Sequence, residues 1–266
     1  MRGRLASWAA IALWVSGVAA GAAPPRAQAT SMVPGALRRF GVVRVLRTLP
    51  GPPGLTAALV TTSGGQKAVV WVLGNGTAVA TGQVWDAQGH DLTRAMAIRM
   101  GLIPRPLAPT AVAAAVARLR GFVLGTGGPE ITLFLDPNCI FCHRLYAAAL
   151  PLLAAGKLRL RVVLVGFLKP TSFDRASAIL MASDPARALA ADERGFDVAA
   201  EEGGIAPATA IPAPIHAAIV ADTKLLAQSG AEATPTLLFQ DRAGHWRIMH
   251  HAPPEGLAAL VGQLVR

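Results

Sequence analysis

Cys139 and Cys142 are the only two cysteines in this chain of 266 residues, and two residues separate them. They follow the apolar run 131–135, which is typical of a buried strand, and they precede the segment 144–153, which is typical of a helix. The N-terminus of a helix stabilises a thiolate because its unpaired N–H groups and its dipole favour negative charge. The spacing therefore predicts thiol–disulfide chemistry, with Cys139 as the nucleophile and Cys142 as the resolving thiol one turn further along.

His143 lies four residues after Cys139. One helical turn would bring its imidazole near the thiolate and let it tune the pKa of Cys139, although the same position is also compatible with a solvent-facing side chain. Ile140 and Phe141 lie between the cysteines, where we expect them to contact a bound substrate.

Three other chemistries fit parts of the same motif. Cys139 to His143 matches the Cys-x-x-Cys-His pattern of covalent haem attachment, but the strand before it and the predicted hairpin after 236 are unlike the mostly helical haem-binding domains. The two cysteines and His143 could bind zinc together with His245, His250 or His251, but the chain has no second Cys-x-x-Cys and no paired histidine spacing outside 250–251. A structural disulfide at so short a spacing would constrain little of the chain. We therefore favour redox chemistry and expect neither a metal nor a cofactor.

A second motif, Ala233-Thr234-Pro235, lies just before the strand-like run 236–240. Proline is tolerated at the start of a strand, so an ordinary turn also explains it. In a thioredoxin fold, however, this loop faces the cysteines and its proline is cis, which turns the preceding backbone outward to pair with a bound polypeptide. Thr234 and Pro235 are accordingly candidate substrate-binding residues.

The first 29 residues have the pattern of an export signal. Arg2 and Arg4 precede the apolar stretch 5–23, and Ala-Gln-Ala at 27–29 forms a cleavage motif. No later stretch has the length and apolar character of a membrane span, so we expect no stable membrane insertion. The formal charge of +10 is spread along the chain without interleaved aromatic residues, which argues against nucleic-acid binding.

The order of the remaining patterns predicts an α+β protein. Residues 30–92 contain four strand-like runs separated by Gly- and Pro-rich turns, residues 93–128 a helical linker, and residues 129–266 a strand, helix and strand followed by a helical insertion over about 171–229. A β-hairpin and a last helix complete the third region. This is the layout of a thioredoxin-like domain with an insertion.

These residues together resemble the thiol:disulfide interchange proteins of the DsbC/DsbG family, and DsbG more closely. The resemblance covers nearly the whole chain after residue 29, and it is carried by Phe-Leu-Asp-Pro-Asn-Cys-Ile-Phe-Cys at 134–142, Val-Gly-Phe-Leu-Lys-Pro at 165–170, Ser-Asp-Pro-Ala at 183–186 and Ala-Thr-Pro at 233–235.

The resemblance implies a periplasmic homodimer. Residues 30–92 would form a cystatin-like dimerisation domain, and two thioredoxin-like domains would face a shared cleft. It also implies that Cys139 attacks misoxidised exported proteins, at wrong disulfides or sulfenic acids, that Thr234 and cis-Pro235 contact them, and that a DsbD-like membrane reductase keeps the cysteines reduced.

One departure concerns the direction of the reaction. DsbG-like proteins usually carry Pro-Tyr between the cysteines, whereas this chain has Ile140 and Phe141. These two positions tune the stability of the thiolate, so the resemblance does not fix the redox potential. A DsbA-like disulfide oxidase and a redox-independent chaperone are the alternatives to an isomerase or reductase.

Overall fold

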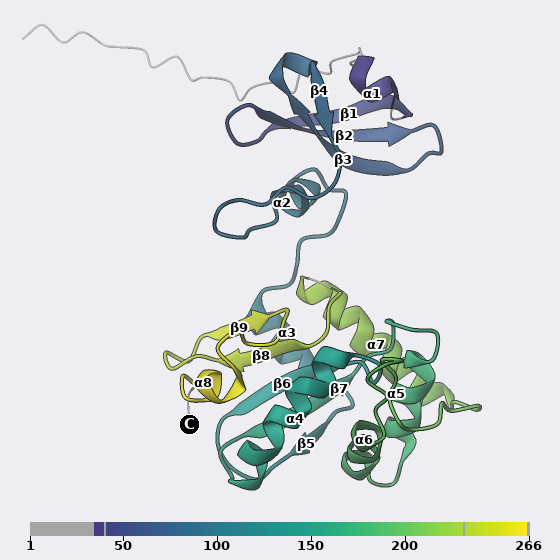
Figure 1. Ribbon diagram of the computed structural model, residues 1–266, viewed down its shortest axis with the longest axis vertical. Helices are drawn as coiled ribbons and strands as arrows, with labels where there is room; N and C mark the ends of the chain where they lie inside the picture. The colour runs from purple at the N-terminus through teal and green to yellow at the C-terminus, as the bar shows by residue number, and fades with distance from the viewer. Residues whose placement is uncertain (1–34, 40, 231, 265–266) are drawn as a thin grey trace, which may run out of the picture. The chain divides into compact units, whose positions relative to one another are not determined.

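The computed structural model describes residues 35–39, 41–230 and 232–264 (Figure 1). The predicted export signal lies outside these residues. The chain divides between Ile103 and Pro104 into two units, called here the first and the second unit. Among the described helices, none combines the length and apolar character needed to cross a membrane.

The first unit is a four-stranded antiparallel meander with strands in the order β1-β2-β3-β4. The strands are β1 (Val42–Pro50), β2 (Leu55–Thr62), β3 (Lys67–Leu73) and β4 (Ala78–Ala80), and the short helices are α1 (Gly35–Arg39), η1 (Gly74–Gly76) and α2 (Leu92–Arg99). Alternation along β2 sends Ala57 and Leu59 to the face covered by α2, and Ala58 and Val60 to the face covered by α1. The sheet thus buries both of its faces.

The second unit contains a five-stranded mixed sheet with strands in the order β5-β7-β6-β8-β9. Its strands are β5 (Phe122–Leu124), β6 (Glu130–Leu135), β7 (Arg159–Leu164), β8 (Thr236–Gln240) and β9 (Trp246–Met249). Its helices are α3 (Pro109–Val116), α4 (Ile140–Ala154), α5 (Ser172–Met181), α6 (Pro185–Arg194), α7 (Ala213–Ser229) and α8 (Leu257–Val261). β6 pairs parallel with β7 through the crossover helix α4, and antiparallel with β8.

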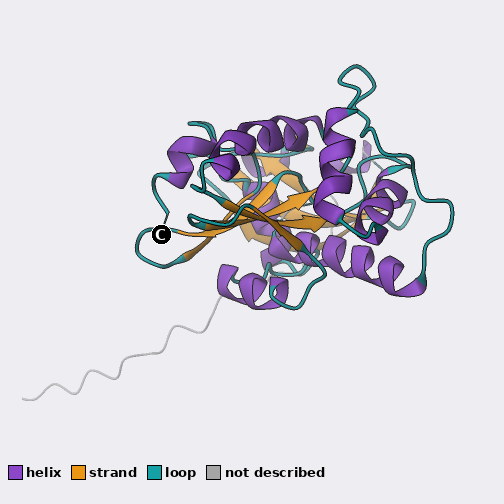
Figure 2. Ribbon diagram, turned by 90° about the horizontal axis from the view of Figure 1, so that it is seen from below, coloured by secondary structure: helices purple, strands orange, loops and turns teal. Residues whose placement is uncertain are grey.

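Helices cover both faces of this sheet (Figure 2). Ile131, Leu133 and Leu135 of β6 point into the larger core, which contains α4, α5, α6 and α8. Phe134 points to the opposite face and packs with α3 and part of α7. Burial on both sides explains why β6 is a continuous apolar run rather than an alternating one. The predicted thioredoxin-like fold with a helical insertion is confirmed.

In the stretch predicted as a helical linker, residues 93–128, the structure contains most of α2, all of α3 and the strand β5. Helix α2 packs on the first sheet through Met96 and Ala97, whereas α3 packs on the second sheet through Val112 and Val116. The strand β5, which the sequence analysis did not predict, pairs antiparallel with β7. The linker's elements therefore belong to the two units, because each helix buries its apolar side against the sheet next to it.

Candidate active site

Cys139 occupies the junction between β6 and α4. It is the N-cap residue of α4, and its Sγ accepts a hydrogen bond from the backbone N–H of Cys142 at 3.3 Å. Its thiol also lies 3.3 Å from the carbonyl oxygen of Thr234, to which it donates. Both cysteines are free thiols. The sulfur of Cys139 therefore takes the capping place that a serine or aspartate oxygen fills in other helices.

The two thiols have opposite electrostatic environments. The pKa of Cys139 is lowered to about 6, mainly by hydrogen bonding from the side chain of Cys142 and further by the side chain of Thr234 and the backbone N–H groups of Cys142 and Phe141, which together outweigh the effect of burial. Complete burial raises the pKa of Cys142 well above its ordinary value, and the hydrogen bond to Cys139 adds to this. At neutral pH the pair therefore holds a thiolate at 139 and a thiol at 142, which is the division that nucleophilic attack and later resolution require.

Thr234 and Pro235 lie directly before β8, on the loop that reaches Cys139. The peptide bond between them is cis. The hydroxyl Oγ1 of Thr234 is buried and has no partner among the described nitrogen and oxygen atoms. The structure thus brings together two segments that are 95 residues apart in the sequence.

The two residues between the cysteines differ in exposure. Phe141 is 56% exposed, and the guanidinium of Arg144 lies 5.7 Å from the centre of its ring. Ile140 is only 8% exposed. Both were predicted to contact a substrate, but only Phe141 presents an apolar side chain to solvent next to the thiols.

His143 has a buried acidic partner that the sequence analysis did not identify. Its Nδ1 lies 2.7 Å from Oε2 of Glu193, which is on α6 in the helical insertion and is only 6% exposed. The imidazole also stacks on Phe196, with ring centres 4.5 Å apart. No local motif marks Glu193, because it is 50 residues away and becomes a neighbour only when the insertion packs against α4.

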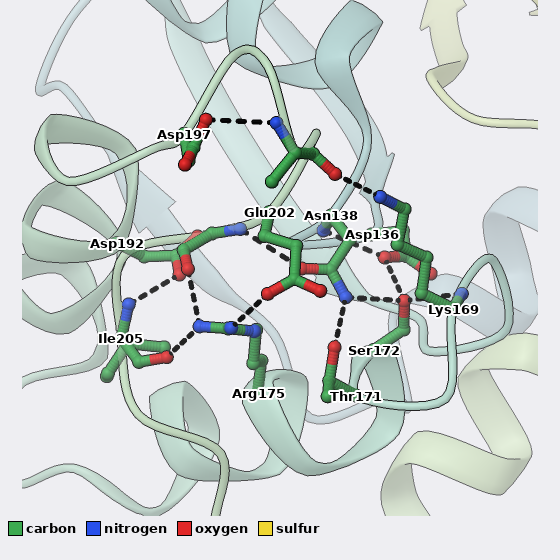
Figure 3. Close-up of polar contacts among 12 residues, drawn as sticks. Asp136, Asn138, Lys169, Thr171, Ser172, Arg175, Asp192, Asp197, Glu202 and Ile205 are labelled. Carbon is green, nitrogen blue, oxygen red and sulfur yellow. Dashed lines mark hydrogen bonds and ion pairs between the residues drawn. The ribbon is translucent and has the colours of Figure 1, made fainter.

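A buried polar network fixes the loop that carries Cys139. The carboxylate of Asp136 accepts hydrogen bonds from the backbone N–H groups of Asn138, Phe167 and Leu168 at 2.9–3.1 Å. It also accepts a bond of 2.7 Å from the hydroxyl of Ser172 (Figure 3). This carboxylate joins the end of β6 to the loop after β7 and to the start of α5.

Asn138 extends the network into the insertion. Its amide nitrogen donates to the hydroxyls of Thr171 and Ser172, and its amide oxygen accepts from the N–H of Gly203 at 3.0 Å (Figure 3). Arg175, which pairs with Glu202 at 2.9 Å, donates to the carbonyl oxygen of Gly203. The residue directly before the nucleophile is thus held by α5 and by the loop after α6. The Asp-Pro-Asn sequence before Cys139 was the available signal for this network.

Asp222 is a further buried carboxyl group. It is fully buried on α7, and neither of its oxygens has a partner among the described residues. Burial raises its pKa to about 8. Among the described residues, no group of three His, Cys, Asp or Glu side chains is arranged to hold a metal ion.

Comparison with known proteins gives one relative that spans most of the chain. No protein-family model matches. The thiol:disulfide interchange protein DsbG of Pseudomonas aeruginosa is 30% identical over 226 residues, which is 82% of this chain and 84% of the relative. DsbG of Escherichia coli is 42% identical over 57 residues, 21% of this chain and 23% of the relative.

Solved structures with a similar chain path include the catalytic domain of Proteus mirabilis ScsC, at 14% identity and a TM-score of 0.46, covering 58% of this chain and 96% of that one. They also include Helicobacter pylori DsbG, at 14% identity and a TM-score of 0.36, covering 73% and 92%. From the identity and coverage of the Pseudomonas aeruginosa relative, this chain belongs to the DsbG family of thiol:disulfide interchange proteins.

Proposed function

We propose that this protein is a periplasmic thiol–disulfide isomerase and reductase that acts on misoxidised cysteines of exported proteins. The observation that carries the proposal is the environment of Cys139, whose sulfur lies at the start of α4 between the N–H of Cys142 and the carbonyl oxygen of Thr234. Hydrogen bonding from the side chain of Cys142 is the main cause that lowers the pKa of Cys139 to about 6, which makes Cys139 a thiolate at neutral pH.

The reaction on a non-native disulfide would proceed in two exchanges. The Cys139 thiolate attacks one sulfur, so that a mixed disulfide forms, the substrate S–S bond breaks and a substrate thiolate leaves. In isomerisation a substrate thiolate then attacks the substrate sulfur of the mixed disulfide, so that a different substrate disulfide forms and Cys139 leaves as a thiolate. In reduction Cys142 loses its proton and attacks the mixed disulfide, so that two electrons pass to the substrate and a disulfide forms between Cys139 and Cys142.

A sulfenic acid would enter the same cycle. The Cys139 thiolate attacks the sulfenic sulfur, and the hydroxyl group leaves as water after taking up a proton. Resolution by Cys142 then returns the substrate thiol. Reduction of the resulting disulfide requires an external dithiol, and we assign that role to a DsbD-like membrane reductase by analogy with the family.

Single substitutions at the two cysteines test the mechanism. Cys139→Ser should abolish refolding of a scrambled-disulfide substrate. Cys142→Ser should instead accumulate a mixed disulfide that is visible on a non-reducing gel and is released by dithiothreitol. Retention of activity by Cys139→Ser, in protein shown to be folded by circular dichroism, would rule the proposal out.

Disulfide oxidation is a second candidate function, and the low pKa of Cys139 is the observation that favours it. Stabilising the thiolate favours the reduced form of the couple and makes its disulfide a stronger oxidant. A pKa of about 6 lies between the values of about 3.5 for DsbA and about 7 for thioredoxin. The equilibrium with glutathione separates the two functions: a potential near that of DsbA would favour the oxidase.

We also propose that the first unit forms a homodimer. β1 is an edge strand of its sheet, because among the described strands it pairs with β2 alone. Its side chains Val43 and Leu46 are 59% and 37% exposed. An exposed edge strand with apolar side chains is suited to pairing with a second copy. Sedimentation equilibrium tests this: a dimer is expected, and Val43→Lys should shift it toward monomer.

A further inference from the structure

A buried acid–imidazole pair lies next to the nucleophile and has no part in the mechanism described above. Glu193 contributes Oε2 and His143 contributes Nδ1, and the two atoms are 2.7 Å apart. Glu193 is 6% exposed, so its carboxyl group is largely removed from water. At this distance one hydrogen-bonded proton lies between the two side chains.

The pair has a fixed orientation relative to Cys139. The backbone N–H of His143 donates to the carbonyl oxygen of Cys139 at 3.0 Å, which fixes its place on the first turn of α4. Phe196 stacks on the imidazole at 4.5 Å with the two ring planes 12° apart. Helix α4, helix α6 and the loop after α6 therefore hold this imidazole together.

The charges around Glu193 come from both helices. On α6 its neighbour Asp192 is also buried, and at the N-cap of α4 the thiolate of Cys139 acts on it. Burial first, then Asp192 and then Cys139 raise the pKa of Glu193 to about 8. Burial and then the charge of Glu193 raise the pKa of Tyr146 on α4, whereas Arg194 on α6 lowers it. Of the influences on Glu193, only the charge of Cys139 disappears when the couple is oxidised.

We infer that Glu193 is a positioning residue that links a proton to the redox state of the couple. Glu193 is protonated and hydrogen-bonded to His143 while Cys139 is a thiolate. When Cys139 enters a disulfide, a fraction of the molecules release this proton to solvent. The inference rests on the proposed function. The balance is complete: oxidation removes two electrons and the Cys142 proton, and the additional fraction of a proton comes from the carboxyl group.

Reciprocity between the two sites gives a measurable consequence. Where Glu193 is ionised, its charge repels the thiolate and disfavours the reduced form, so the couple becomes more reducing as pH rises through about 8. Glu193→Gln keeps the size of the side chain and a hydrogen-bonding group but has no charge to develop. Wild type and variant should therefore diverge with pH.

The experiment compares full-length wild type and Glu193→Gln in equilibrium with glutathione from pH 6.5 to 9. The ratio of oxidised to reduced protein should agree within about twofold at pH 6.5 and be about threefold to tenfold higher in wild type at pH 9. Glu201→Gln removes an exposed carboxylate of the same insertion and should follow wild type throughout. A difference between Glu193→Gln and wild type that is the same at every pH would overturn the inference and leave a structural role.

A measurement on wild type serves if the variant does not fold. The side-chain carboxyl carbon of Glu193, followed by ¹³C NMR, should titrate at a higher pH in the reduced protein than in the oxidised protein. Equal midpoints would refute the link. Failure of the proposed function is distinguishable, because the cysteines would then not equilibrate with glutathione at all.

Discussion

The two units of this protein differ in how they treat polar side chains. Every described polar or charged side chain that is buried belongs to the second unit, and these residues are Thr132, Asp136, Asn138, Ser172, Arg175, Ser177, Asp192, Glu193, Asp222, Ser229 and Thr236. The buried clusters of the first unit contain apolar residues alone among those described, with Trp71 as the largest. Both units are β-sheets covered by helices, so the fold type does not account for the contrast.

The contrast follows from what each unit must position. Burying a polar group costs free energy unless it is hydrogen-bonded, and a network that is only partly bonded is less stable than an apolar core. The second unit contains such groups within three residues of Cys139, where Asp136 and Asn138 fix the backbone that carries the thiol. We interpret the polar interior as the means by which a reactive sulfur is held in place, which a sheet without reactive groups does not need.

The largest expected effect comes from removing the centre of the network. Asp136→Ala leaves four donors without their acceptor, three of them backbone N–H groups. Because the carboxylate of Asp136 is fully buried, we expect a loss of roughly 3–5 kcal/mol in the free energy of unfolding. Urea denaturation of the reduced protein measures it.

The matched control is Asp86→Ala in the first unit. Asp86 also accepts backbone N–H groups, from Gln88 and His90, but it does so in an exposed loop where water replaces the lost acceptor. Its substitution should change stability far less. Equal losses at the two aspartates would contradict the view that burial distinguishes the units.

The second effect depends on pH. Burial raises the pKa of Asp222 to about 8 from an unfolded value of 3.8, so the folded state binds a proton that the unfolded state releases. The stability that comes from this proton is complete below pH 3.8 and is lost as pH rises through about 8. The amide side chain of Asp222→Asn does not titrate, so the variant does not show this pH-dependent loss of stability. Relative to wild type, the variant should gain roughly 3 kcal/mol between pH 4 and pH 7.

Urea denaturation at both pH values measures this change. The cost of burying an amide without a partner is the same at both pH values and cancels in the comparison. The test is therefore how the stability difference between variant and wild type changes with pH. A difference between Asp222→Asn and wild type that stays flat from pH 4 to pH 7 would mean that the carboxyl group is solvated in the folded state.

The sequence was sufficient for features that depend on local pattern. The strand 131–135, the helix N-terminus at the cysteines and the hairpin after Pro235 follow from apolar runs, helix signals and turn residues, and the structure contains all three. Their order along the chain was enough to predict the thioredoxin-like sheet. β5 was missed because three residues, Phe122 to Leu124, are too few for a periodic pattern.

Which polar residues are buried could not be predicted from local pattern. Glu193 and Asp222 lie on helices that also carry solvated charges, and one sequence does not say which side of a helix meets the sheet and which meets another helix. Their burial depends on how the insertion packs against α4 and β7. For the same reason His143 could be proposed as a neighbour of Cys139, whereas its partner Glu193 could not.

The smallest expected effect concerns the first unit and tests whether its few polar contacts matter to the chemistry. The hydroxyl of Thr93 accepts hydrogen bonds from the indole Nε1 of Trp71 at 2.8 Å and from the N–H of Val84 at 2.9 Å. Thr93→Val keeps the shape of the side chain and leaves a fully buried tryptophan with an unpaired N–H. We expect a loss of about 1–2 kcal/mol in the unfolding of this unit, measured by tryptophan fluorescence during urea denaturation.

Thr56→Val, at an exposed position of β2 in the same sheet, is the control and should change stability little. Neither substitution should alter the glutathione equilibrium of Cys139, because the contacts that set its pKa come from α4 and the Thr234 loop. A shifted equilibrium in Thr93→Val would show that the first unit communicates with the thiol. The polar interior of the second unit would then be only part of what positions the reactive sulfur.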